Sequence, residues 1–165
     1  MPNIKIIVHR DRDYLDDQEV KKFKESFEKK EIHVWITPGT DVEALFLNEK
    51  HIAVQYPKLS ESEIKEMLDE VVNDPIVKRT SLDKLSKHLL KNDAEASDNP
   101  RHVSSPIEIV EKSQQMYSEN PERYIHGKKA IGIMKNKLQK ARQDVSLLVS
   151  MSSELYQGDL HQLLK

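Results

Sequence analysis

The sequence predicts an α/β fold in which a small parallel β-α-β sheet is followed by a helical C-terminal region. Two β-branched apolar runs of strand length, at 4–8 and 32–36, flank a segment with the apolar spacing of a helix. After residue 50 the strand signal fades and helix-start signals recur. This order of elements predicts an α/β unit of about 50 residues backed by helices.

The first three elements follow one another closely. The strand at 4–8 ends in a charged string at 9–13. The helix expected at 16–30 has its apolar residues on one face, with acids early and lysines late, as the helix dipole favours. A helical crossover makes the two strands parallel, so the carboxyl ends of both strands lie at one edge of the sheet.

The rest of the chain is divided by composition and by helix-start signals. We expect four segments, namely an α/β half-domain at 1–56, a helical segment at 57–91, a linker or exposed loop at 92–104, and a C-terminal helical region at 105–165. Residues 52–56 are either a third short strand or an irregular segment.

Capping patterns predict where individual helices begin. Ser60-x-x-Glu63 and Ser105-Pro106-x-Glu108 are capping boxes, and the second also has proline at the first helical position. Apolar residues between 147 and 155 predict a further helix that ends at Gly158.

The composition excludes several classes of protein. The chain has 165 residues, no Cys and only four Gly, with 26 Lys and Arg against 28 Asp and Glu. The lack of Cys excludes disulfide scaffolds and thiolate chemistry, and the few glycines disfavour an ATP or dinucleotide loop. The seven His include no i, i+4 pair, so zinc has no support. Because no apolar run is long enough to span a membrane, we expect a cytoplasmic protein without membrane contact.

Acidic residues follow both predicted strands. Asp11 and Asp13 come directly after the first strand, and Asp41 and Glu43 follow the second. Neighbouring carboxylates on an extended segment can reach one hard cation, and open parallel sheets bind ligands at the carboxyl ends of their strands. We therefore expect Mg²⁺ or Mn²⁺ at this edge, the alternative being a charged loop that is simply solvated.

These motifs resemble a known family. The run IKIIVHRDRDYL at 4–15, the helix and strand after it, and TPGTDVEALFL at 37–47 look like the second half of a TOPRIM domain. The likeness is closest to the version fused to ATPases in overcoming-lysogenization-defect (OLD) nucleases and related phage-defence proteins. The stretch at 124–129, YIHGKK, is similar to a Gly-Lys segment that opens a C-terminal helix in that family.

The resemblance implies a metal-dependent endonuclease of an ATPase-coupled phage-defence or repair system. It makes Asp11 and Asp13 the catalytic, metal-binding pair, with Glu43 and Asp41 as further metal ligands. Lys128 becomes the catalytic lysine. The implied partners are nucleic acid, expected to be DNA, and an ATPase. In such a site metal ions activate a water, and a lysine stabilises the transition state.

One part of the family pattern has no counterpart in this sequence. The first TOPRIM strand, whose following glutamate acts as general base or metal ligand, should precede Ile4, and the ATPase portion is also absent. We therefore expect part of a larger enzyme, a split gene product or a relic. On this view the chain alone has weak or no nuclease activity, and a partner polypeptide supplies the remainder. A homo-oligomer is left open.

Basic residues dominate one late stretch. Between 123 and 143 there are seven Lys or Arg and no Asp or Glu, in a chain of net charge −2. Such a stretch is typical of non-specific phosphate contact, and equally of a helix with a solvated basic face. Together with two arginines near the first strand, the predicted nucleic-acid contacts are Arg10, Arg12, Lys128, Lys129, Lys135 and Arg142.

Two other functions fit parts of the pattern. Haloacid-dehalogenase-like phosphatases also place D-x-D after a first strand. That class has a hydroxyl residue shortly after the pair, whereas Tyr14 and Leu15 follow it here, and the sequence shows no further strands. The second alternative is a non-catalytic interaction module whose helices dock an ATPase partner and whose acids are vestigial. Metal binding would separate the interaction module from the nuclease.

Overall fold

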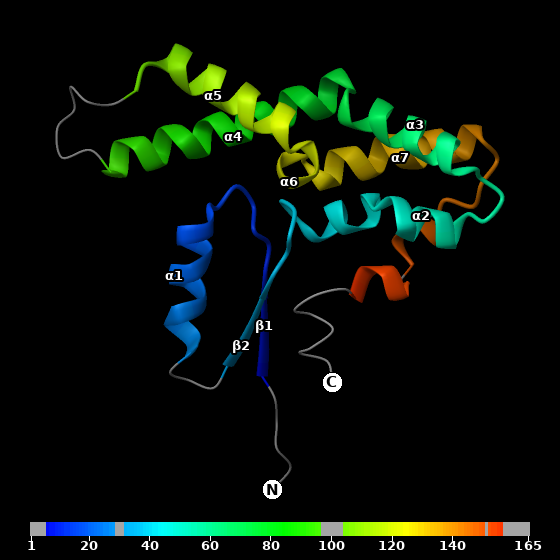
Figure 1. The fold of residues 1–165 in the computed structure, drawn as a ribbon, viewed down its shortest axis with the longest axis horizontal. Helices are drawn as coiled ribbons and strands as arrows, with labels where there is room; N and C mark the ends of the chain where they lie inside the picture. The colour runs from blue at the N-terminus through cyan, green and yellow to red at the C-terminus, as the bar shows by residue number, and fades with distance from the viewer. Residues whose placement is uncertain (1–5, 29–31, 97–103, 151, 157–165) are drawn as a thin grey trace, which may run out of the picture.

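The computed structural model describes residues 6–28, 32–96, 104–150 and 152–156. Within them, a two-stranded sheet and one helix lie beside a layer of helices, as Figure 1 shows. The described part of the chain is therefore an α/β structure in which helix predominates.

The sheet consists of β1 (Ile6–Arg10) and β2 (Ile32–Ile36), which pair in parallel over their full lengths. Helix α1 (Asp17–Glu28) connects them. These elements confirm the predicted β-α-β unit and the parallel pairing. The first strand ends two residues later than predicted, at Arg10, and residues 4 and 5 lie outside the described part.

The two faces of the sheet differ in what covers them. On one face the Arg10 guanidinium lies over the Phe23 ring of α1, 4.3 Å from the ring centroid. On the other face His9 stacks on Trp35, with ring centroids 4.7 Å apart. Side chains alternate between faces along a strand, so α1 packs on the face that carries Arg10.

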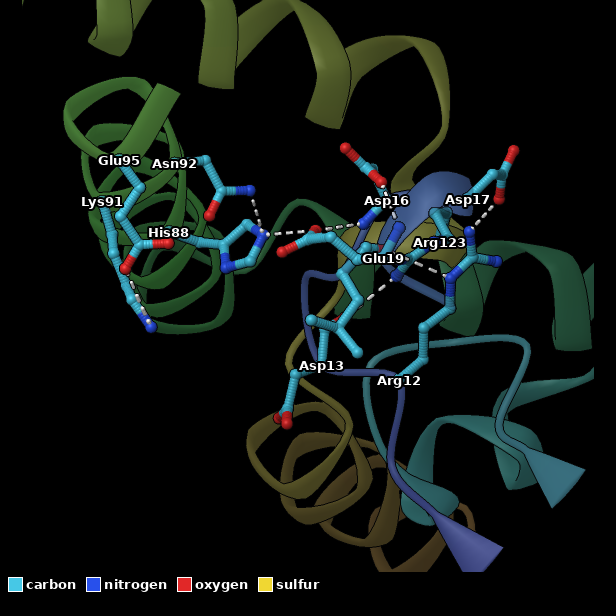
Figure 2. Close-up of polar contacts among 11 residues, drawn as sticks. Arg12, Asp13, Asp16, Asp17, Glu19, His88, Lys91, Asn92, Glu95 and Arg123 are labelled. Carbon is cyan, nitrogen blue, oxygen red and sulfur yellow. Dashed lines mark hydrogen bonds and ion pairs between the residues drawn. The ribbon is translucent and has the colours of Figure 1, made fainter. Parts of the chain in front are cut away.

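Helix α1 is fixed at its start and against a second helix. The Asp16 and Glu19 side chains each accept a hydrogen bond from the other residue's backbone N–H, over 2.8 and 2.7 Å. Glu19 Oε2 also lies 3.1 Å from His88 Nε2 of α4 (Pro75–Ala96), a contact that Figure 2 shows. This contact joins the β-α-β unit to the helical layer.

The helical layer is built from helices of very different lengths. Its α-helices, besides α4, are α2 (Glu49–Gln55), α3 (Glu61–Val72), α5 (Pro106–Glu119), α6 (Pro121–Tyr124) and α7 (Gly127–Lys140). Short 3₁₀ turns are η1 (Val42–Leu47), η3 (Leu147–Val149) and η4 (Ser153–Tyr156). Both predicted capping boxes are present at the starts of α3 and α5.

One core joins helices from segments that are far apart in the sequence. Ile52 of α2, Ile64 of α3 and Met134 of α7 are fully buried and belong to the same cluster. His51 is also fully buried, where its Nε2 lies 2.8 Å from the Leu148 carbonyl. A carbonyl only accepts, so this nitrogen carries the proton. The helical segments predicted at 57–91 and 105–165 thus share a core with residues of the first segment.

Residues 52–56 form neither of the structures that we considered for them. Residues 52–55 are the end of helix α2, and Tyr56 is its C-cap. The spacing of the buried residues gives the reason, because Ile52 and Tyr56 are buried four residues apart while Val54 between them is 56% exposed. A strand with that pattern would bury Val54 on the same face.

Two other boundaries also differ from prediction. Helix α4 continues to Ala96, so the loop expected from residue 92 does not begin there, and residues 97–103 lie outside the described part. The helix expected across 147–155 is replaced by the short turns η3 and η4. The hydroxyl of Ser146 bonds to Asp144 Oδ1 over 2.7 Å, an example of the local side-chain bonding that competes with helix. Gly158 is not among the described residues.

None of the helices in the described ranges is both long enough and apolar enough to cross a lipid bilayer.

Candidate functional site

The loops that follow β1 and β2 are joined by hydrogen bonds. The Thr37 N–H donates to the Arg10 carbonyl over 3.2 Å, and the Asp13 N–H donates to the Thr40 carbonyl over 2.6 Å. The Arg12 N–H donates to the Thr37 hydroxyl over 2.8 Å. The two acidic segments therefore lie at the same edge of the sheet, as parallel pairing requires.

Asp11 reaches from the first loop to the second. Its Oδ1 accepts a hydrogen bond of 3.1 Å from the N–H of Val42, at the start of η1. His9 Nε2 lies 3.5 Å from the same oxygen, and the Asp11 side chain keeps 34% of its surface exposed. Asp11 is thus anchored at the edge that carries Asp41 and Glu43 while solvent still reaches its side chain.

Asp41 is buried, and both of its carboxylate oxygens bind backbone. Oδ1 accepts from the Ala44 N–H over 3.0 Å, and Oδ2 accepts from the Lys128 N–H over 3.2 Å. The first bond caps η1 and the second lies in the first turn of α7, so one carboxylate holds two helix starts. This geometry is that of a helix cap, and it does not support the metal-ligand role that we predicted for Asp41.

The environment of Asp41 also affects its ionisation. Burial raises the pKa of Asp41, the two backbone N–H donors lower it, and the negative charges of Glu43 and Asp11 raise it again. Asp11 and Glu43 are thus both close enough to Asp41 to affect its charge. The acids of the two loops therefore form one cluster.

Helix α7 begins in direct contact with this cluster. A Cβ atom on Gly127 would lie 1.8 Å from Asp41 Oδ1 and 2.4 Å from the Ala44 nitrogen, distances that no real side chain tolerates. Glycine is therefore required at this position by the close approach of α7 to η1. As a result Lys128, the predicted catalytic lysine, lies next to the acidic edge although it is far from it in sequence.

The backbone of Asp13 is held by hydrogen bonds, while its side chain points away from them. Its backbone has φ of 51°, in the left-handed region, and its side chain is exposed. The Asp13 carbonyl accepts from Arg123 Nη1 over 3.0 Å, and the Leu15 carbonyl accepts from Arg123 Nη2 over 2.6 Å. Figure 2 shows the Asp13 carboxylate pointing away from Arg12 and Arg123. The guanidinium of Arg123 thus fixes the loop and leaves the carboxylate facing outward.

The arginines of this region are engaged inside the fold. Burial, and next the positive charge of Arg12, lower the pKa of Arg123 to about 10, so Arg123 stays charged at neutral pH. Arg12 pairs with Asp17 and donates from Nε to the Leu15 carbonyl over 3.3 Å. Arg10 lies over the Phe23 ring. Arg10 and Arg12 therefore have structural contacts, whereas their predicted contacts with nucleic acid stay predictions.

Three buried polar atoms lack a hydrogen-bond partner within the described ranges, and they gather around Asp41. They are the Tyr14 hydroxyl, Glu43 Oε2 and His126 Nδ1. His126 Nδ1 lies 3.8 Å from Asp41 Oδ2, and Glu43 lies two residues after Asp41. Burial raises the pKa of Tyr14, and the charge of Asp41 is the next cause. Buried polar groups without partners are rare and are typical of strained or functional places.

His126 and Tyr14 are the members of this cluster that sequence reasoning missed. Burial, and next the positive charge of Lys84, lower the pKa of His126, and Lys128 and Lys129 act in the same direction. His126 is therefore neutral at pH 7. The position of His126 directly before the Gly-Lys segment could have indicated its place in the site. Nothing in the sequence distinguishes Tyr14 from a core tyrosine.

The other predicted basic residues lie along and beyond α7. Lys129 is exposed in the first turn, and Lys135 is half-buried further along the helix. Arg142 is exposed just after the helix, with a left-handed φ of 57°. Lys129 and Lys135 thus lie on α7 and Arg142 beyond its end, while the hydrogen bond to Asp41 comes from the first turn of the helix.

A metal requires more ligands than this edge supplies. The residues whose positions are described contain no group of three or more His, Asp or Glu side chains that could hold a metal ion. Asp41 is used as a cap, and Asp11 already accepts from Val42. The side chains present therefore do not make a complete Mg²⁺ or Mn²⁺ site by themselves.

No protein-family model, curated protein or solved structure matches the chain.

Proposed function

We propose that this chain carries part of a TOPRIM-type nuclease site, and that a second polypeptide completes it. The observation that carries the proposal is the hydrogen bond from the Lys128 N–H to Asp41 Oδ2. This bond holds a lysine beside acids that follow both strands, Asp11 and Glu43. Acids and a lysine at the carboxyl end of a parallel sheet are the residue types that phosphodiester cleavage uses.

Each residue has a role that its surroundings allow. Lys128 is exposed, and its ammonium group can bind a phosphate oxygen and stabilise the charge that develops there. Asp13 faces outward, and Asp11 is partly exposed. Glu43 has a buried carboxylate oxygen without a hydrogen bond in the described ranges, and this oxygen is therefore available to bind a ligand. Mg²⁺ or Mn²⁺ is the proposed cofactor, with ligands from the second polypeptide as well.

The sheet offers a surface for that second polypeptide. Parallel sheets are normally covered on both faces, and their strand residues are apolar because they are buried. In β1, however, Ile6 is 52% exposed and Ile7 is 36% exposed. An ATPase chain that packs on the face opposite α1, which carries Ile7, would cover this residue and bring its own acids to the same edge. The preferred substrate is DNA.

A second candidate function is a non-catalytic module that docks an ATPase partner. The observation that favours it is the double cap made by Asp41, because a carboxylate used in this way needs no catalytic explanation. The exposed Ile107 and Val110 on α5, 71% and 46% exposed, would suit such docking. The two candidates differ in whether Asp11 and Lys128 affect DNA cleavage.

A plasmid-nicking assay tests the proposal. The full chain is incubated in excess over supercoiled DNA with Mn²⁺, and conversion to open circles is followed with time. We expect slow nicking that Asp11→Asn and Lys128→Gln each reduce at least about tenfold. Lys137→Gln is the matched control, because Lys137 is on the same helix but pairs with Glu70 on α3.

The other outcomes of the assay are equally informative. Fast nicking that depends on Asp11 would show that the chain is a complete nuclease, against the shared site proposed here. Nicking that Asp11→Asn and Lys128→Gln leave unchanged would favour the non-catalytic docking module.

A further inference from the structure

Helix α7 turns a basic face to solvent. Its apolar residues are buried on one side, at 130, 131, 134 and 138. Residues seven or eleven apart in a helix fall nearly in line, because seven residues make almost two turns and eleven make just over three. On the outer side, Lys128 and Lys135 therefore form one row, and Lys129 and Lys140 form a second.

The strip between these two rows is uncharged, and its side chains are shorter than lysine. It consists of Gly132, Asn136 and Gln139, all of which are exposed. At Gly132 a Cβ atom would meet no other atom within 4 Å, so the space above it is open. We call this surface the lysine face, and its members are Lys128, Lys129, Gly132, Lys135, Asn136, Gln139 and Lys140.

The charges of the lysine face are not balanced within the described part of the protein. None of its four lysines forms an ion pair with a described carboxylate, whereas Lys137 at its flank pairs with Glu70. In addition, the first turn of α7 contains two lysines and no acid, while the first turns of α3 and α5 both contain glutamate. Lysines at a helix N-terminus oppose the helix dipole. This arrangement is unfavourable for the isolated helix and favourable for a bound polyanion.

We infer that the lysine face binds the phosphate backbone of a nucleic-acid strand and directs it to the acidic edge of the sheet. The lysine rows would pair with phosphates, and the amides of Asn136 and Gln139 would donate to phosphate or sugar oxygens between them. The open space at Gly132 lets the strand approach the helix closely. The inference rests on the proposed function, because the row of Lys128 and Lys135 leads to that edge.

The composition of the face favours nucleic acid over a lipid surface. Helices that lie on membranes combine basic residues with large apolar side chains that enter the bilayer. The lysine face has no such side chain, and its centre is glycine and amides. The cations also lie in line along a 14-residue helix, as a linear chain of phosphates requires.

Binding in the absence of metal tests this inference separately from cleavage. Fluorescence anisotropy is measured with labelled single-stranded and duplex DNA in EDTA, over a series of KCl concentrations. Lys135→Gln and Lys140→Gln should each lower the slope of log K against log salt by about 0.7 to 0.9, the value of one lost phosphate contact. Gly132→Glu should weaken binding at least about tenfold, while Gly132→Ala should leave it unchanged.

Lys137→Gln is the matched control, since it removes the same charge from the same helix at a lysine that is already paired. A slope that falls equally in Lys137→Gln would mean that net charge alone drives binding, and would overturn the inference. Binding to phosphatidylserine vesicles but not to DNA, with the same dependence on Lys135, would also overturn it. Thermal unfolding of each variant checks that the fold is intact. If DNA binding follows the lysine face but Asp11→Asn does not affect nicking, the proposed function fails and the binding surface stands.

Discussion

The Oδ2 atom of Asp41 accepts a hydrogen bond of 3.2 Å from the backbone N–H of Lys128, which lies 87 residues later in the sequence. The other oxygen of the same carboxylate accepts from the Ala44 N–H. Asp41 therefore determines where α7 starts relative to the sheet, and it does so from a buried position. The Thr40 hydroxyl, which donates to the Ile125 carbonyl over 2.5 Å, also holds the start of α7 beside the acidic edge.

Replacement of Asp41 should cost stability. In Asp41→Ala the Lys128 N–H loses its acceptor, and the Ala44 N–H keeps only the Asp41 backbone carbonyl, 3.2 Å away. We therefore expect the free energy of unfolding to fall by about 1–3 kcal/mol. Urea unfolding at pH 7 measures this change. Asp83→Ala, which removes an exposed partner of Lys87 on α4, is the control and should change stability by less than about 0.5 kcal/mol. An equal loss in both variants would mean that the cap at Asp41 contributes nothing.

Two glycines of the same helix should respond in opposite ways to alanine. Gly127→Ala forces a Cβ to 1.8 Å from Asp41 Oδ1, so we expect a loss of about 1–3 kcal/mol or more. Gly132→Ala meets open space in the middle of a helix, and alanine should raise stability by about 0.5–1 kcal/mol. Thermal unfolding of both variants measures the pair. A stable Gly127→Ala protein would show that α7 does not approach η1 as closely as described.

His126 should make stability depend on pH. Because burial lowers its pKa, the unfolded chain takes up the proton first, and this residue destabilises the fold increasingly as pH falls below about 6.5. His126→Gln removes that dependence. Between pH 7.5 and 5.5 the stability of the variant relative to the parent should therefore rise, by at most about 1.4 kcal/mol.

Urea titrations of both proteins at several pH values give this difference. Asp41 shifts in the opposite sense, since burial raises its pKa and its protonation favours the folded state, so measurements stay above pH 5.5. If the relative stability of His126→Gln instead falls on acidification, protonated His126 must gain an ion pair with Asp41 that exceeds the cost of burial.

Arg123 should be irreplaceable by lysine. Its two terminal nitrogens donate to the carbonyls of Asp13 and Leu15. Arg123→Ala leaves the Asp13 carbonyl without this donor and the Leu15 carbonyl with only the 3.3 Å bond from Arg12 Nε, at a cost of about 1–3 kcal/mol. A single ammonium cannot reproduce this fork, so Arg123→Lys should recover less than half of the loss. Glu122→Gln, at an exposed neighbour, is the control. Full recovery in the lysine variant would show that charge, rather than the fork, stabilises the loop.

Local signals were sufficient for much of the fold. The capping boxes at Ser60 and Ser105 were readable because each depends on residues three positions apart. The β-α-β unit could be predicted because its strands and helix have clear apolar patterns. Residues 52–56 were misread because a short apolar run fits either period, and only the burial of Ile52 and Tyr56 against α3 and α7 selects the helix.

The candidate site could be predicted only in part. The parallel topology indicated that Asp11 and Glu43 would share an edge, and the structure brings them into one cluster. The capping role of Asp41 depends on a contact with Lys128, and no local pattern encodes a contact across that separation. The burial of His126 beside Asp41 arises in the same way, from the packing of α7 on η1.

Paramagnetic relaxation by Mn²⁺ would show whether the acidic edge of the sheet binds a divalent cation, because it locates cation binding without requiring activity. Low concentrations of Mn²⁺ are added to the ¹⁵N-labelled full chain, and the loss of amide signals is followed. We expect the amides at 11–13, 41–44 and 127–129 to broaden first, and Asp11→Asn to suppress this broadening. Broadening centred on the acid-rich helix α3 instead, or a pattern that Asp11→Asn leaves unchanged, would show that the acidic edge does not bind the cation.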